Sequence, residues 1–113
     1  MAKKRFRIAD VQRLVDEELA VALGVSNRWH GIGPDGVIER LVTPPRSMRF
    51  RRLFGVGFEW RWAVWDERPG SEAGYLIVWG REGCFGLAKK PHGRAYGLFI
   101  GNCGTFAETL MSM

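Results

Sequence analysis

The stretch that decides the fold is Val56-Gly57-Phe58-Glu59-Trp60-Arg61-Trp62-Ala63-Val64-Trp65. Aromatic residues recur at every second position from Phe58 to Trp62, and charged residues stand between them. Successive side chains of a β-strand point to opposite faces, so this alternation predicts a strand with one aromatic face and one polar face. The aromatic face needs a cover from elsewhere in the chain, because each layer of a domain buries its apolar side against another.

The same alternation predicts strands on both sides of this stretch. The expected strands cover residues 36–43, 47–53, 56–65, 75–80, 84–89 and 95–101. Residues 81–83 and 90–93 have the glycines and proline of tight turns, so we expect the later strands to form an antiparallel meander. Residues 43–46 contain two prolines and do not fit a two-residue hairpin turn, so the first two strands need not be neighbours.

Two helices are expected at the ends of the chain. An apolar stripe from Ile8 to Leu23 has helical spacing, Asp10 can cap it, and Gly24 can end it. Near the C-terminus, Thr105 and Glu108 have the spacing of a capping box before a short helix. The sequence therefore predicts an α+β fold, with the N-terminal helix packed on a curved antiparallel sheet of five to six strands. This order resembles the cone-shaped or roll-like NTF2-like and cystatin-like folds in architecture, without a shared motif.

Composition and charge limit the class of protein. The 113 residues are 46% hydrophobic and 26% charged, which is typical of one globular domain over residues 8–113. The net charge is +5, and four basic residues lie in residues 1–7, which we expect to be a flexible basic tail. Two cysteines are too few for a disulfide framework. With no apolar run of membrane-spanning length and no secretion signal, we expect a cytoplasmic protein without membrane contact.

Strand register predicts a core face. Pairing Trp60 with Trp79 and Trp62 with Ile77 keeps the aromatic residues together. We then expect Trp60, Trp62 and Trp79 to be buried under the N-terminal helix. The full predicted core face is Met48, Phe50, Phe58, Trp60, Trp62, Ile77, Trp79, Phe85, Leu87, Tyr96, Leu98 and Ile100.

The opposite face of the sheet has an unusually smooth centre. The predicted register sets Gly86 opposite Gly97 and Ala88 opposite Ala95. One interpretation is a strongly curved sheet with a solvated back. The other is a homodimer interface, which would use Leu76, Val78, Gly86, Ala88, Ala95, Gly97 and Phe99.

The leading functional hypothesis is binding without catalysis, either of a protein partner on the back face or of a small ligand. The ligand pocket would lie between helix and sheet and be lined by Trp29, Trp60, Trp62, Trp79 and Tyr96. The alternative is nucleic-acid binding through basic residues, namely Arg49, Arg51, Lys89, Lys90 and Arg94. Charge on an edge strand and an ordinary solvated turn would also explain those basic residues.

A second alternative is a small cysteine-dependent enzyme. Cys103 precedes the C-terminal helix, and His30 or His92 would have to act as its base. The glycine pairs at 31–33 and 83–86 lack the flanking residues of a phosphate-binding loop. No pair of histidines or cysteines has metal-ligand spacing. The leading expectation therefore stays a protein without catalytic activity, and we expect no cofactor and no metal.

Overall fold

The computed structural model describes residues 7–25, 32–53, 55–80 and 83–112. The predicted basic tail lies outside these residues except for Arg7. The elements in chain order are α1 (Ile8–Val25), α2 (Pro34–Glu39), β1 (Leu41–Arg52), β2 (Phe58–Asp66), β3 (Tyr75–Trp79), β4 (Phe85–Lys89), β5 (Gly97–Gly104) and α3 (Phe106–Met111).

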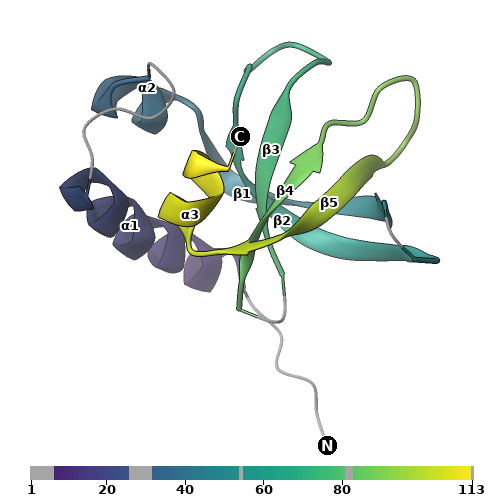
Figure 1. The fold of residues 1–113 in the computed structure, drawn as a ribbon, viewed down its shortest axis with the longest axis horizontal. Helices are drawn as coiled ribbons and strands as arrows, with labels where there is room; N and C mark the ends of the chain where they lie inside the picture. The colour runs from purple at the N-terminus through teal and green to yellow at the C-terminus, as the bar shows by residue number, and fades with distance from the viewer. Residues whose placement is uncertain (1–6, 26–31, 54, 81–82, 113) are drawn as a thin grey trace, which may run out of the picture.

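The five strands follow one another as a meander and close into a small barrel. Neighbouring strands are antiparallel, and the barrel closes where β1 and β5 pair in parallel at Phe50–Arg52. A meander with an odd number of strands brings its first and last strands together in the same direction. Figure 1 shows α1, α2 and α3 gathered on one side of the barrel and the β1–β2 hairpin projecting from the other. The predicted α+β, roll-like fold is confirmed.

The sheet has an apolar core on each of its faces. The barrel interior holds Phe50, Ala63, Leu76, Val78, Ala88 and Phe99. The outer face under the helices carries a second cluster, in which Trp65, Ile77, Trp79 and Phe85 meet Val11, Val15, Phe106 and Leu110. Both faces of β2, β3 and β4 are therefore covered over much of their length.

The terminal helices form as the pattern predicts. The apolar stripe of α1 is buried at Val11, Val15 and Ala22. At α3 the backbone N–H of Glu108 donates to Thr105 Oγ1 at 3.1 Å, and the N–H of Thr105 donates to Glu108 Oε1 at 3.2 Å, which completes the capping box. No helix in the described ranges has the length and apolar character that crossing a bilayer requires.

The expected strand at residues 36–43 is wrong. Residues Pro34–Glu39 form α2, because proline at the start of a helix has the required φ and lacks only an N–H that would be unpaired there. The indole N–H of Trp65 donates to the carbonyl of Val37 at 2.9 Å and ties α2 to the barrel. Residues 41–43 and 47–52 belong instead to one strand, β1, which passes through the proline pair with a register shift between Leu41 and Arg46.

The predicted burial of Trp60 is also wrong. Trp79 pairs with Trp62 and not with Trp60, and a bulge between Ala63 and Trp65 brings Trp65 opposite Ile77. A slip of two residues keeps every side chain on its face, so alternation alone cannot detect it. Trp60 is 67% exposed, whereas Trp79 is buried and Trp62 packs partly against the helix-side cluster. The predicted pairing of β3 with β4, Trp79 with Phe85 and Ile77 with Leu87, is confirmed.

The predicted back face is the interior of the barrel. Gly86 pairs with Asn102 and Ala88 with Phe99, so the predicted partners Gly97 and Ala95 are replaced. Of the residues expected to form a dimer interface, Leu76, Val78, Gly86, Ala88, Gly97 and Phe99 are buried within one chain, and Ala95 is exposed in the β4–β5 connection. The buried six therefore cannot form an exposed contact surface in this fold. Dimerisation itself stays a prediction.

Candidate functional site

The outer face of the β1–β2 hairpin alternates arginines with aromatic rings. Phe50 points into the barrel, so its neighbours Arg49 and Arg51 point outward, and both are exposed. Across the hairpin, Arg49 is paired with Trp60 and Arg51 with Phe58. Phe58 is 51% exposed, and Trp60 is more exposed still. The register thus sets two guanidinium groups beside two water-exposed rings.

The β4–β5 connection adds a third ring and a third guanidinium. The rings of Tyr96 and Phe58 meet edge to face, with centroids 4.9 Å apart. Arg49 Cζ lies 4.9 Å from the centroid of Phe58 and 5.8 Å from that of Tyr96. Arg94 Cζ lies 5.8 Å from Tyr96, and its Nη1 donates to the Tyr96 hydroxyl at 3.4 Å. We call the set Arg49, Arg51, Phe58, Trp60, Arg94 and Tyr96 the arginine–aromatic face.

Charge is segregated between the two sides of the molecule. Residues 40–58 hold five arginines and no acidic residue. The three helices, which lie on the other side of the barrel, carry Asp10, Asp16, Glu17, Glu18, Asp35, Glu39 and Glu108. The hairpin side therefore has a positive potential, which attracts anionic partners.

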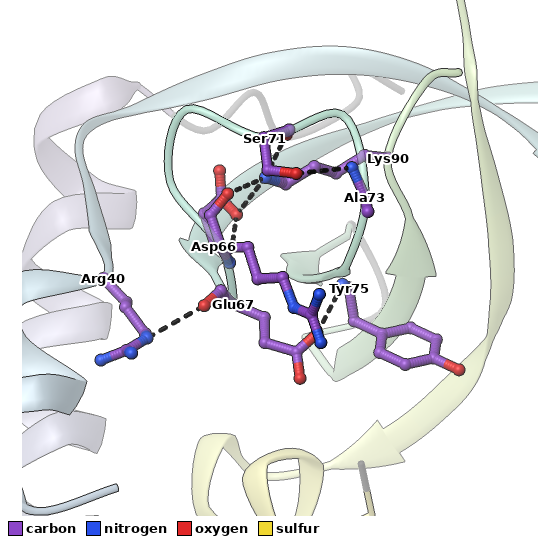
Figure 2. A network of polar contacts seen from close by, with 8 residues as sticks. Arg40, Asp66, Glu67, Ser71, Ala73, Tyr75 and Lys90 are labelled. Atoms are coloured by element: carbon purple, nitrogen blue, oxygen red, sulfur yellow. Dashed lines mark hydrogen bonds and ion pairs between the residues drawn. The ribbon is translucent and has the colours of Figure 1, made fainter.

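Lys90 does not belong to this face, because its ammonium group holds a loop together. Lys90 Nζ contacts Asp66 Oδ1 and donates to the carbonyls of Arg68 and Ser71, the latter at 2.8 Å. An ammonium has three protons, and these three oxygens account for them. Figure 2 shows the ammonium enclosed by the β2–β3 connection. The prediction that Lys90 contacts nucleic acid therefore conflicts with its surroundings, since only 8% of its side chain is exposed.

The rest of that connection is held by further contacts within the chain. Glu67 Oε1 accepts from the backbone N–H of Tyr75 at 3.1 Å, and the Glu67 carbonyl accepts from Arg40 Nε at 2.9 Å (Figure 2). A pocket of about 560 Å³ lies beside this connection, and Lys89 lines it together with Glu67 and Glu72. Lys89 is thus placed on the wall of this pocket, whereas Arg49 and Arg94 lie beside the rings of Phe58 and Tyr96.

The five residues of the expected ligand pocket are not brought together. Trp29 lies outside the described residues. Trp62 and Trp79 are neighbours beneath the helices, where α1 and α3 side chains pack against them. Trp60 and Tyr96 lie on the arginine–aromatic face instead. A small ligand between helix and sheet stays a prediction, and its proposed lining is divided between two surfaces.

The described residues include only part of the expected cysteine site. Cys103 belongs to β5, but its side chain and all of His30 lie outside the described residues. His92 is exposed, and its Nδ1 lies 3.5 Å from Glu72 Oε2. Within the described ranges, no group of three histidine, cysteine, aspartate or glutamate residues is placed to hold a metal ion.

The structure reveals one polar cluster to which the sequence analysis assigned no role. Arg61 points into the mouth of the barrel, where its guanidinium carbon lies 3.8 Å from the centroid of Phe99 and its side chain is 4% exposed. Glu59 and Asn102 receive hydrogen bonds from it. The sequence signal was an arginine between the two central tryptophans of the aromatic strand, which alternation places on the buried side of a closed barrel.

Comparison with known proteins gives no further guide. No protein-family model, no curated protein and no solved structure matches the chain. The function is therefore inferred from the arginine–aromatic face and its surroundings.

Proposed function

We propose that the chain binds single-stranded nucleic acid on the arginine–aromatic face. The observation that carries the proposal is the cross-strand pairing of Arg49 with an exposed Trp60, next to the Phe58–Tyr96 ring pair. Exposed rings stack on unpaired bases, and guanidinium groups bind phosphate oxygens through two parallel hydrogen bonds. One surface thus offers both contacts that a nucleotide strand requires.

The arrangement favours single strands over duplexes. In a duplex the flat faces of the bases are already stacked on each other, so side-chain rings cannot reach them without disrupting it. Phe58, Trp60 and Tyr96 offer their contacts only to bases whose faces are open. Recognition by stacking tolerates any sequence, because every base has such a face.

Protection of a sheet edge does not explain these arginines. Charge on an edge strand prevents unwanted pairing with another chain. However, β1 is paired with β2 on one side and, at Phe50–Arg52, with β5 on the other. Arg51 therefore lies where both sides of the strand are already occupied. Edge protection also gives no reason for exposed aromatic rings beside the arginines.

Fluorescence anisotropy with a labelled oligothymidylate of about 12 nucleotides, within the span that small folds cover, tests the proposal. We expect the chain to bind this oligonucleotide and to bind a duplex of equal length more weakly. Trp60→Ala should weaken binding by about 5- to 150-fold, the equivalent of losing one stacked base. The matched control is Val21→Ala, an exposed apolar residue on α1.

Two results would contradict the proposal. One is no binding of the oligothymidylate at low salt by the unmodified chain. The other is an affinity that Trp60→Ala leaves unchanged. Because Trp60 is exposed, the variant should melt near the temperature of the unmodified chain, so lost binding cannot be attributed to unfolding.

A further inference from the structure

The mouth of the barrel forms a second polar site close to the arginine–aromatic face. A pocket of about 470 Å³ opens there, and it is lined by Arg52, Leu53, Glu59, Arg61, Phe99, Ile100 and Asn102. Glu59 and Arg61 lie on β2 next to Trp60, and their side chains point to the opposite side of the strand. The two sites thus share one short segment of backbone.

The polar groups of this pocket are fixed by a buried guanidinium. Arg61 Nη2 donates to Glu59 Oε2 at 3.0 Å, and Nη1 donates to Asn102 Oδ1 at 3.3 Å. Arg52 Nε lies 3.4 Å from Glu59 Oε1. One guanidinium, packed on the Phe99 ring, therefore holds a carboxylate and an amide side by side.

These contacts determine what the pocket offers a ligand. A carboxylate has about four acceptor positions, and the contacts with Arg52 and Arg61 use one on each oxygen of Glu59. Because a guanidinium only donates, Asn102 must turn its oxygen toward Arg61 and its NH₂ group away from it. Asn102 is exposed, so this NH₂ group can meet a ligand. The pocket presents a carboxylate acceptor next to an amide donor.

We infer that this pocket binds an unpaired guanine base, an inference that rests on the proposed function and gives it sequence preference. The pairing edge of guanine has two adjacent donors, N1–H and N2–H₂, followed by the acceptor O6. Glu59 accepts from the two donors, and the Asn102 amide donates to O6. Adenine and cytosine offer a donor beside an acceptor, and thymine offers one donor between two acceptors, so none of them matches.

The backbone of β2 lets one strand of nucleic acid reach both sites. In the described part of the chain, β2 pairs with β3 only from Trp62 onward, whereas Phe58–Arg61 has β1 as its pairing partner. Glu59 and Trp60 are consecutive residues of this segment, so a nucleotide strand that reaches it can stack one base on Trp60 and insert the next beside Glu59.

The test uses labelled oligothymidylates that differ in a single central base. Guanine at that position should raise the affinity of the unmodified chain by about 5- to 150-fold over adenine, which is the range for one bidentate base contact. Hypoxanthine, which lacks the N2 amino group, should fall between the two. Equal affinity for all three bases would overturn this inference and leave the proposed function standing. No binding of any of these oligonucleotides would overturn both.

Variants test whether the preference for guanine over adenine arises in the pocket at the mouth of the barrel. Glu59→Gln should reduce the ratio of guanine to adenine affinity to within about twofold, because the amide replaces one acceptor with a donor. Asn102→Ala should reduce the same ratio and leaves the contact between Arg61 and Glu59 in place, so it serves if Glu59→Gln folds poorly. Val21→Ala on α1 is the control that should leave the ratio unchanged. A guanine preference that survives in both Glu59→Gln and Asn102→Ala would overturn the assignment to this pocket.

Discussion

Two adjacent lysines show how surroundings decide the role of a residue. Lys89 and Lys90 are the same residue type at adjacent positions, and both were expected to contact an anionic partner. Lys90 instead lies against Asp66 and two backbone carbonyls of the β2–β3 connection, whereas Lys89 stays exposed at the end of β4. Chain position alone could not separate them, because the partners of Lys90 lie about 20 residues earlier, and only the fold brings them close.

This difference gives a prediction for the pair. Lys90→Met keeps the aliphatic stem and removes the ammonium group, so three oxygens lose their charged donor. We expect the free energy of unfolding to fall by about 1.5–3 kcal/mol, the usual value of hydrogen bonds to charged groups. Lys89→Met should change it by less than about 0.5 kcal/mol. Urea denaturation measures both, and equal effects would contradict the assigned role.

At the scale of single elements, the sequence indicated the faces of β2 and β3 better than their register. For β1 the predicted face was wrong, because Phe50 pairs with Glu59 and not with Trp60 and lies in the barrel interior. Alternation correctly placed Trp62 and Ile77 on one face of the sheet and Arg61 and Val78 on the other. The face to which a side chain points depends only on its position along its own strand. Alternation failed for the alignment of β2 with β3, where a bulge between Ala63 and Trp65 and a two-residue slip left Trp60 in water. The site depends on that slip, so the exposed tryptophan could not be predicted.

The continuity of β1 was missed for a related reason. A pair of prolines usually excludes a central strand, since proline has no N–H for the ladder. In β1 the prolines fall at the register shift between Leu41 and Arg46, where the ladder is interrupted anyway. The arginines at 49 and 51 were recognised from sequence, but their placement on a strand paired on two sides required the closed barrel.

Two glycines of β5 provide a prediction at the scale of one element. A Cβ on Gly97 would lie 2.5 Å from the Lys89 carbonyl oxygen and 2.7 Å from the Phe50 ring, while one on Gly101 would meet nothing within 4 Å. Gly97→Ala should therefore cost about 1–3 kcal/mol of stability through overpacking. Gly101→Ala, in the same strand, should be neutral or slightly stabilising. Thermal melting compares them, and similar melting temperatures would show that close approach at Gly97 is unimportant.

At the scale of the whole molecule, the helix side and the hairpin side of the barrel differ both in charge and in how far the sheet is buried. The helices bury the outer face of β2, β3 and β4 and carry most of the acidic residues, and the hairpin opposite them carries arginines and exposed rings (Figure 1). The sequence already indicated this division through the acid-free run at residues 40–58. It could not show that Arg94 and Tyr96 join that run, because they reach it through the closure of the barrel.

The division of charge predicts how binding responds to salt. Each phosphate contact with a single strand contributes about −0.7 to the slope of log affinity against log salt concentration. With Arg49, Arg51 and Arg94 in contact, that slope should be about −2. Arg51→Ala should make the slope shallower by about 0.7, whereas Arg13→Ala on α1 should not change it. A slope near zero would exclude phosphate contacts by these arginines.

Closure of the barrel between β1 and β5 has a consequence for the order of assembly. Phe50 meets Gly97 across nearly half the chain, while the three later strand pairs join neighbouring segments. Ordering a long loop before it gains contacts is entropically costly, so local hairpins form ahead of distant pairings. The seam at Phe50–Arg52 is therefore expected to close late and to open early. Arg49, Tyr96 and Arg94 come together only across this seam, so the surface that they share exists only once the chain has finished folding.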